Sequence, residues 1–315
     1  MGITRQQALD CFASDDLIGI GMEADAVRRS LHPEGVVSYT IDRSLDCSDP
    51  DLDARYNSVR KAIEMGATSV ILQAGTQQRV TLDHYESLFA GIKQRFPEVW
   101  LHGLSATEIL ALAAPSQLSL RDAIARLRNA GLDSIASNAI IFDDEVRHRV
   151  APGKCSAADW ISVHRTAHQL GMNTTATMIF GVGETIAQRI DHLEILRNLQ
   201  EETGGFTSFT PLAHPSSIAT EPTAVEYLKT LAVSRLYLDN IENLQAAGNA
   251  EDATQGLKVL QMGLRFGGND VGSVLLEERF GKPGGATEEE LRRIIREAGF
   301  KPVQRDTLYR TMFLN

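Results

Sequence analysis

The chain has 315 residues, 43% of them apolar, with a formal net charge of −10 and an isoelectric point of about 5.3. This acidity argues against nucleic acid as the main partner, because nucleic-acid-binding proteins present a basic face to phosphate groups. No run approaches the roughly 18 apolar residues of a membrane-spanning helix. Residues 1–10 also lack the basic and then apolar pattern of a secretory signal. We therefore expect a cytoplasmic protein that binds a small molecule, with neither nucleic acid nor a membrane as partner; the oligomeric state stays open.

The cysteine pattern also indicates a cytoplasmic protein. Cys11, Cys47 and Cys155 stand far apart in the sequence, with no CxxC pair and no even-numbered disulfide framework. Isolated thiols in an acidic chain are typical of a reducing cytoplasm.

One pattern repeats along the chain: a short β-branched or apolar run is followed by a stretch with apolar residues at helical spacing. The expected strands are 36–41, 69–72, 100–102, 134–136, 175–180, 206–209, 243–245 and 264–266. The expected helices between them are 59–65, 82–95, 120–130, 157–170, 187–202 and 224–238. Alternation of this kind predicts parallel strands with helical crossovers, and this many units predict an α/β fold of the TIM-like (β/α) barrel type.

The pattern also suggests how the chain is divided. Residues 1–35 read as an N-terminal helical cap, residues 36–280 as the barrel, and residues 281–315 as a C-terminal helical extension packed on it. In that extension Thr287 stands three residues before Glu290, which is the spacing of a capping box at the start of a helix.

Chemistry in such barrels takes place at the C-terminal ends of the strands. Polar side chains at the predicted ends give the catalytic candidates Asp42, His102 and His214. Histidine acts as an acid or a base near neutral pH, and a carboxylate can assist it. Because the two histidines show no metal-ligand spacing, we expect no metal ion at this site.

Five segments of the chain carry a specific resemblance: 37–43, 171–181, 199–206, 226–241 and 266–273. In them the chain resembles the dehypoxanthine futalosine cyclase family of radical S-adenosylmethionine (SAM) enzymes, which act in menaquinone biosynthesis. The likeness runs from about residue 14 to residue 309. It implies the barrel of the radical SAM type, while fold likeness alone says less about activity.

The same resemblance implies where SAM or an adenosine-like ligand would bind. The end of the second strand matches the stretch whose backbone holds the SAM amino group, and the fifth strand matches the stretch that lies along adenine. The residues expected to contact this ligand are Gln73, Gly75, Ser137, Asn138, Met178, Ile179, Gly181 and Glu184.

The chain departs from the family directly after the first strand. The family has a CxxxCxxC loop there, whose three thiolates hold a 4Fe–4S cluster, whereas residues 42–56 of this chain contain Cys47 alone. From this we expect no iron–sulfur cluster. The function expected is that of a cluster-less biosynthetic enzyme that performs redox-neutral chemistry on SAM, a nucleoside or an aromatic metabolite. The alternative is a catalytically silent paralogue that binds a ligand or partners a futalosine-pathway cyclase.

Overall fold

The computed structural model describes residues 2–47, 51–73, 80–214, 222–247, 253–275 and 286–310. The strands are β1 (Val36–Asp46), β2 (Ser69–Gln73), β3 (Trp100–Ser105), β4 (Ser134–Ala136), β5 (Thr174–Phe180), β6 (Phe206–Ala213), β7 (Asn243–Leu244), β8 (Asp270–Leu275) and β9 (Lys301–Gln304). The helices are α1 (Arg5–Ala13), α2 (Leu17–Leu31), α3 (Leu52–Glu64), α4 (Leu82–Arg95), α5 (Ala106–Ala113), α6 (Leu120–Ala130), α7 (Asp144–Val150), α8 (Ala157–Gln169), α9 (Ile186–Thr203), α10 (Ala224–Tyr237), α11 (Ala253–Gly263) and α12 (Glu288–Glu297).

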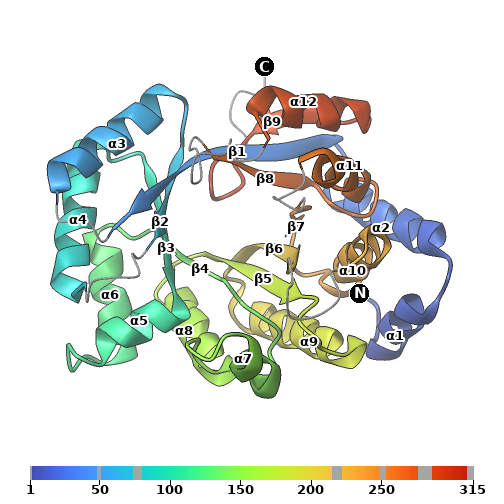
Figure 1. Ribbon diagram of the computed structural model, residues 1–315, viewed down its shortest axis with the longest axis horizontal. Helices are drawn as coiled ribbons and strands as arrows, with labels where there is room; N and C mark the ends of the chain where they lie inside the picture. The colour runs from blue at the N-terminus through green and yellow to red at the C-terminus, as the bar shows by residue number, and fades with distance from the viewer. Residues whose placement is uncertain are drawn as a thin grey trace.

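The strands form a closed parallel ring, which confirms the predicted (β/α) barrel. One sheet runs in the order β4-β3-β2-β1-β8 and a second in the order β5-β6-β7. Two isolated parallel bridges join them, Ile140 with Ile179 between β4 and β5, and Gln245 with Asp270 between β7 and β8. Figure 1 looks into this ring and shows the helices arranged around its outside. Helices α1 and α2 pack against α10 on the outer layer.

The two faces of the strands have different chemistry. Leu101 and Ile135 are fully buried between the ring and the helices. The residues that alternate with them point into the ring, because successive side chains of a strand point to opposite faces. There His102 of β3 bonds the hydroxyl of Ser134 on β4. Barrels of this type are ordinarily filled with branched apolar side chains. The interior of this barrel therefore includes a polar pair at a place where apolar packing is the usual arrangement.

The structure corrects the predicted position of the eighth strand. Leu264 and Phe266 lie in the turn that follows α11, where the N–H of Gly268 donates to the carbonyl of Gly263 at 3.1 Å. Gly267 has φ +99° there, and a Cβ on it would meet Arg235 at 2.8 Å. The two apolar residues are buried against the core, but they lie in a turn and not in a strand. So short an apolar run does not distinguish a buried strand from another buried segment, which is why the prediction was wrong.

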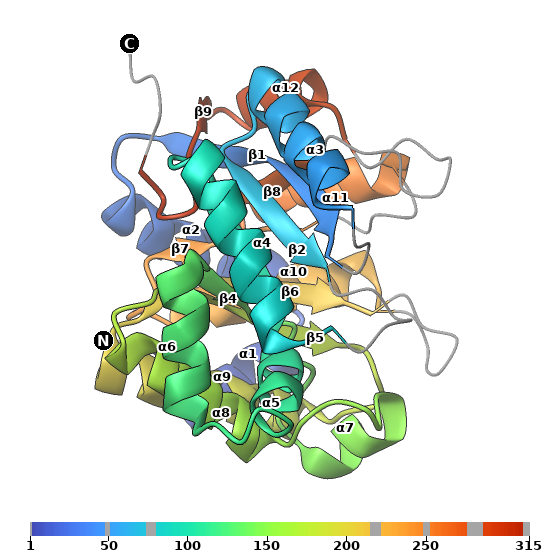
Figure 2. The same ribbon diagram turned by 90° about the vertical axis from the view of Figure 1, so that its left-hand side faces the viewer.

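A strand that was not predicted closes one end of the barrel. Strand β9 pairs in parallel with the first half of β1, in the register Val36 with Lys301 to Tyr39 with Gln304. Figure 2 shows β9 on the left, while the arrowheads of β2, β5 and β6 point to the right. The segment after α12 therefore covers the N-terminal end of the barrel, and the predicted capping box of α12 is present.

Buried histidines join this barrel to its helices. His192 of α9 is fully buried; its Nε2 bonds the carbonyl of Thr177 at 2.9 Å, and its Nδ1 bonds the N–H of Phe142 at 3.2 Å. A carbonyl only accepts and an N–H only donates, so His192 carries its proton on Nε2 and is neutral. Burial lowers the pKa of His192 to about 3; the bond to Thr177 opposes this lowering in part, and the positive charge of Arg147 adds a smaller lowering.

We expect this histidine to make the fold sensitive to acid. Below about pH 6.5 the unfolded chain protonates His192 and the folded chain does not, so stability falls by up to about 1.4 kcal/mol per pH unit from this residue. The variant His192→Gln keeps one acceptor and one donor but does not titrate. Urea denaturation at pH 7 and pH 5 should show a smaller loss of stability in His192→Gln than in the wild type.

The matched control is His148→Gln, because His148 is exposed on α7. Between pH 7 and pH 5, His148→Gln should lose as much unfolding free energy as the wild type. An equal pH dependence in all three proteins would contradict the assignment.

Candidate functional site

Asn138 and His214 stand at two strand ends on the C-terminal side of the barrel, with β5 between their strands. Asn138 follows β4, is exposed, and has φ +44°, a left-handed conformation that asparagine tolerates better than most residues. His214 follows β6, where its backbone N–H donates to the carbonyl of Phe180 at 2.8 Å. The Nδ1 atom of His214 is shielded from solvent and has no hydrogen-bond partner among the described residues. Both residues therefore remain candidates for contact with a ligand.

Asp42 lies inside the barrel rather than at the end of a strand. Strand β1 continues to Asp46, and Asp42 pairs in register with Ser69, the first residue of β2. Its carboxylate accepts hydrogen bonds from the hydroxyls of Ser69 and Thr40. Burial raises the pKa of Asp42 above its ordinary value, while the hydroxyl of Ser69 and the charge of Arg305 oppose that rise.

His102 is also an interior residue. Strand β3 continues three residues beyond it, and its Nδ1 lies 2.7 Å from the hydroxyl of Ser134, which also accepts the indole N–H of Trp100. Burial lowers the pKa of His102 to about 4, and the positive charge of Arg305 adds to the effect. His102 is therefore neutral near pH 7. The catalytic roles of His102, His214 and Asp42 stay predictions, and only His214 stands at the end of its strand.

The hydroxyl of Ser137 connects the segment after β4 to β5. Its hydroxyl oxygen accepts from the backbone N–H of Thr177 at 2.9 Å and from the hydroxyl of the same residue at 3.0 Å. Its carbonyl accepts the indole N–H of Trp160 at 2.8 Å. The side chain expected to contact SAM thus holds β4 to β5.

Met178 and Ile179 face opposite sides of β5. Met178 is fully buried on the same face as Phe180, whose ring stacks near Tyr227 of α10. Ile179 is half-buried, and its backbone closes the ring by bonding Ala139 and residue 141. The side chain of Met178 therefore points to the helices, while that of Ile179 points to the barrel interior.

Glu184 is engaged within its own turn. Its two oxygens accept the N–H groups of Gly181 and Val182 at 2.9 and 2.8 Å, and Arg189 donates to it at 2.6 Å. Burial raises the pKa of Glu184, but the N–H of Gly181 and the charge of Arg189 outweigh this, and the pKa lies below its usual range. A Cβ on Gly181 would meet Pro222 at 2.2 Å, so glycine is required for the close approach of the chain.

The remaining expected ligand contacts lie on β2. Gln73 is the last residue of that strand, and Gly75 lies outside the described residues. Their contact with SAM stays a prediction.

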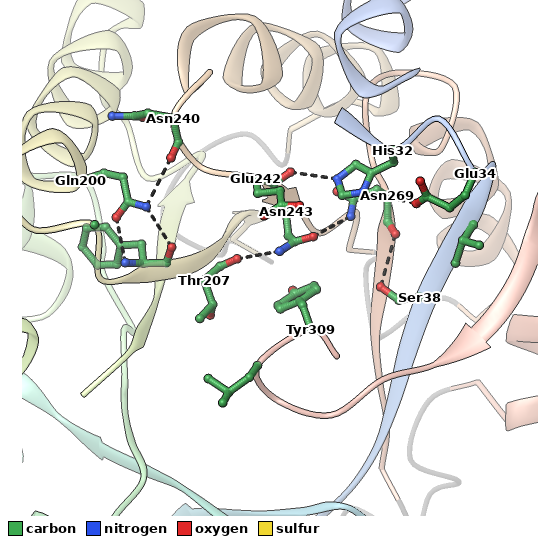
Figure 3. A pocket seen from close by; sticks show the side chains of 14 residues that line it. His32, Glu34, Ser38, Gln200, Thr207, Asn240, Glu242, Asn243, Asn269 and Tyr309 are labelled. Atoms are coloured by element: carbon green, nitrogen blue, oxygen red, sulfur yellow. Dashed lines mark hydrogen bonds and ion pairs between the residues drawn. The ribbon is translucent and has the colours of Figure 1, made fainter. Parts of the chain in front are cut away.

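A cavity of about 470 Å³ lies at the opposite end of the barrel (Figure 3). Its lining includes Val36, Phe206 and Asn243, each the first residue of a strand. The amide groups there bond one another: Asn269 donates to Asn243 at 2.9 Å, and Asn243 donates to the carbonyl of Thr207 at 2.9 Å. These groups hold the floor of the barrel together, so we place the candidate site at the other end.

The comparisons with known proteins agree with this fold. The family model described as "Radical SAM superfamily" matches residues 42–196, and "CofH/MqnC C-terminal region" matches residues 206–314. Cyclic dehypoxanthine futalosine synthase of Streptomyces coelicolor is 34% identical over 98% of this chain and 85% of its own length. Aminodeoxyfutalosine synthase of Thermus thermophilus is 38% identical over 83% of this chain and 74% of its own length. The FeFe-hydrogenase maturase HydG from Carboxydothermus hydrogenoformans superposes with a TM-score of 0.73 at 13% identity, over 98% of this chain and 78% of that one.

These matches confirm the resemblance and overturn two expectations. The relatives carry the names of futalosine-pathway synthases, so the expected redox-neutral, cluster-less enzyme is wrong, and so is the alternative of a silent paralogue. The superfamily match and the named relatives also point to a 4Fe–4S cluster together with SAM. The expectation of no iron–sulfur cluster is contradicted by that finding.

The cysteines of this chain do not fit the three-thiolate ligand set of such a cluster. Cys11 lies on α1, Cys47 directly after β1, and Cys155 between α7 and α8, and none of the three forms a disulfide bond. The thiol of Cys47 is buried and donates to the carbonyl of Leu45 at 3.6 Å. In the described part of the chain no group of three or more His, Cys, Asp or Glu side chains is placed to hold a metal ion. We therefore derive no chemical step through a cluster.

The hydrogen bonds of Ser137 give a test of its structural role. The variant Ser137→Ala should lose about 1–3 kcal/mol of unfolding free energy, because the N–H of the half-buried Thr177 then loses its acceptor. Urea denaturation measures this loss. Ser87→Ala is the control, because the hydroxyl of Ser87 only bonds the carbonyl of Asp83 on an exposed helix. A loss in Ser137→Ala no larger than in Ser87→Ala would contradict the role.

Proposed function

Because this chain belongs to the radical SAM superfamily, we propose that it is a SAM-binding enzyme whose small-molecule substrate is of the kind its futalosine-synthase relatives are named for. The observation that carries the proposal is the polar interior of the barrel, where Asp42 and His102 bond to Ser69 and Ser134. Chemistry in barrels of this type takes place at the C-terminal ends of the strands, directly above such an interior.

The substrate would lie over this interior. His102, neutral near pH 7, offers an imidazole that can accept or donate a hydrogen bond without charge. Asn138 and His214 would orient the substrate from the strand ends, since each has a polar side-chain atom for which no hydrogen bond to a described residue is found. Ile179 would supply an apolar surface between them.

SAM would lie along the ends of β2, β4 and β5, near Gln73, Gly75, Asn138, Ile179 and Gly181. SAM supplies the reactive sulfonium group when bound, and these residues would fix its orientation. The three cysteines form no disulfide bond, which favours a reducing compartment, so we place the enzyme in the cytoplasm. Among the described helices none has the length and apolar character needed to cross a membrane.

Calorimetry with SAM and with dehypoxanthine futalosine tests this function. We expect both to bind, and Asn138→Ala or His214→Ala to weaken the binding of at least one of them. Loss of one hydrogen bond to a ligand corresponds to roughly 10-fold in Kd, at about 1.4 kcal/mol.

The controls are Asn129→Ala and His148→Ala, since both residues are exposed on outer helices. They should bind as the wild type does. Absence of binding for both ligands to the folded wild-type protein would reject the proposal. Binding that neither Asn138→Ala nor His214→Ala changes would reject the site.

A further inference from the structure

The cavity of about 470 Å³ at the N-terminal end of the barrel has a lining that suits a ligand of its own. We propose that it is a second binding site, separate from the candidate site at the C-terminal end, for a small organic ammonium ion whose N–H groups bond His32 and Glu34. A volume of this size lies within the range of small-molecule pockets. The inference goes beyond the proposed function, and neither depends on the other.

The turn between α2 and β1 places His32 and Glu34 on one wall of this cavity. His32 ends α2: its backbone N–H donates to the carbonyl of Arg28 at 2.8 Å, and Pro33 has no N–H with which to continue the helix. Gly35 follows with φ +67°, a conformation that favours glycine, and β1 begins directly after it. Figure 3 shows the two side chains next to each other.

The hydrogen bonds of His32 leave one ring nitrogen as an acceptor. Its Nε2 atom lies 3.1 Å from the carbonyl oxygen of Glu242. A carbonyl only accepts, so Nε2 carries the proton, and Nδ1 of the neutral ring then has a lone pair. Burial lowers the pKa of His32, which favours this neutral form. The side chain of His32 is only 11% exposed, and its Nδ1 lies 3.6 Å from Oε1 of Glu34.

Two acceptors that lie side by side need a donor. A separation of 3.6 Å is too long for a direct hydrogen bond between Nδ1 and Oε1. An ammonium group has three donors and no acceptor, so it can bond both atoms at once. Its charge is matched by the two carboxylates of the lining, Glu34 and Glu242, whereas no Lys or Arg is found among the described residues that line the cavity. The alternative is a protonated His32 that pairs with Glu34 without a ligand.

The rest of the lining fits the apolar part of such a molecule. Val36, Phe206 and Leu308 supply apolar surface. Asn240, also in the lining, has a side-chain oxygen that is shielded from solvent and has no hydrogen-bond partner among the described residues. The lining therefore has acceptors to spare, which favours a ligand rich in donors over an anion.

The experiment titrates the full chain with n-pentylammonium at pH 7.5, with 1-pentanol as its uncharged counterpart. We expect n-pentylammonium to bind with a Kd on the order of 1 mM, which suits so small a molecule, and 1-pentanol to bind at least about 10-fold more weakly. NMR of the histidine ring nitrogens follows the binding, with the His32 signals assigned through His32→Gln. These signals should shift as the ligand binds, while the ring stays neutral.

A charge-removing variant locates the site. Glu34→Gln should weaken n-pentylammonium binding about 10-fold, as expected for loss of one hydrogen bond to a charged group, and should leave 1-pentanol binding unchanged. The matched control Glu145→Gln removes the same charge from an exposed position on α7 and should bind as the wild type does.

Three results would overturn the inference. The first is n-pentylammonium binding no tighter than that of 1-pentanol. The second is an equal effect of Glu34→Gln and Glu145→Gln. The third is a His32 ring that carries both protons at pH 7.5 in the ligand-free protein, because Nδ1 is then a donor to Glu34. None of these results bears on whether SAM binds at the other end of the barrel.

Discussion

The buried ion pair between Arg305 and Asp270 is the interaction on which the lower half of the barrel depends. It joins the C-terminal segment to β8 and, through Ser38, to β1. Removing one partner of such a pair is strongly destabilising, by about 3–5 kcal/mol, because the other charge is left buried and alone. The pair therefore requires that strand β9 is formed.

This polar interior links structure to function. The hydroxyls of Ser69 and Ser134 satisfy Asp42 and His102, because a buried polar group without a partner is costly. The opposite faces of the same strands carry apolar residues such as Ile135, which anchor the helices. Alternation along each strand thus lets one sheet support a hydrophobic outer core and a lumen suited to a polar ligand.

The sequence predicts the barrel well and its ends less well. Helices 82–95 and 120–130 agree with α4 and α6, because their apolar spacing and capping residues are local properties. Asp42 was predicted at a strand end because a polar residue after an apolar run indicates one. In the structure β1 continues past it, and Ser69 of the neighbouring strand supplies its hydrogen bond. Strand β9 was missed for the same reason: its pairing with β1 spans most of the chain, and no local pattern reports it.

We propose that ligand enters at the C-terminal end of the barrel, above a floor closed by Arg305. A crystal structure of the protein with SAM and dehypoxanthine futalosine is the decisive measurement. Density is expected at the strand ends beside Asn138 and His214, with Arg305 and Asp270 still paired below. Density confined to the opposite cavity, around Asn243 and Tyr309, would contradict it.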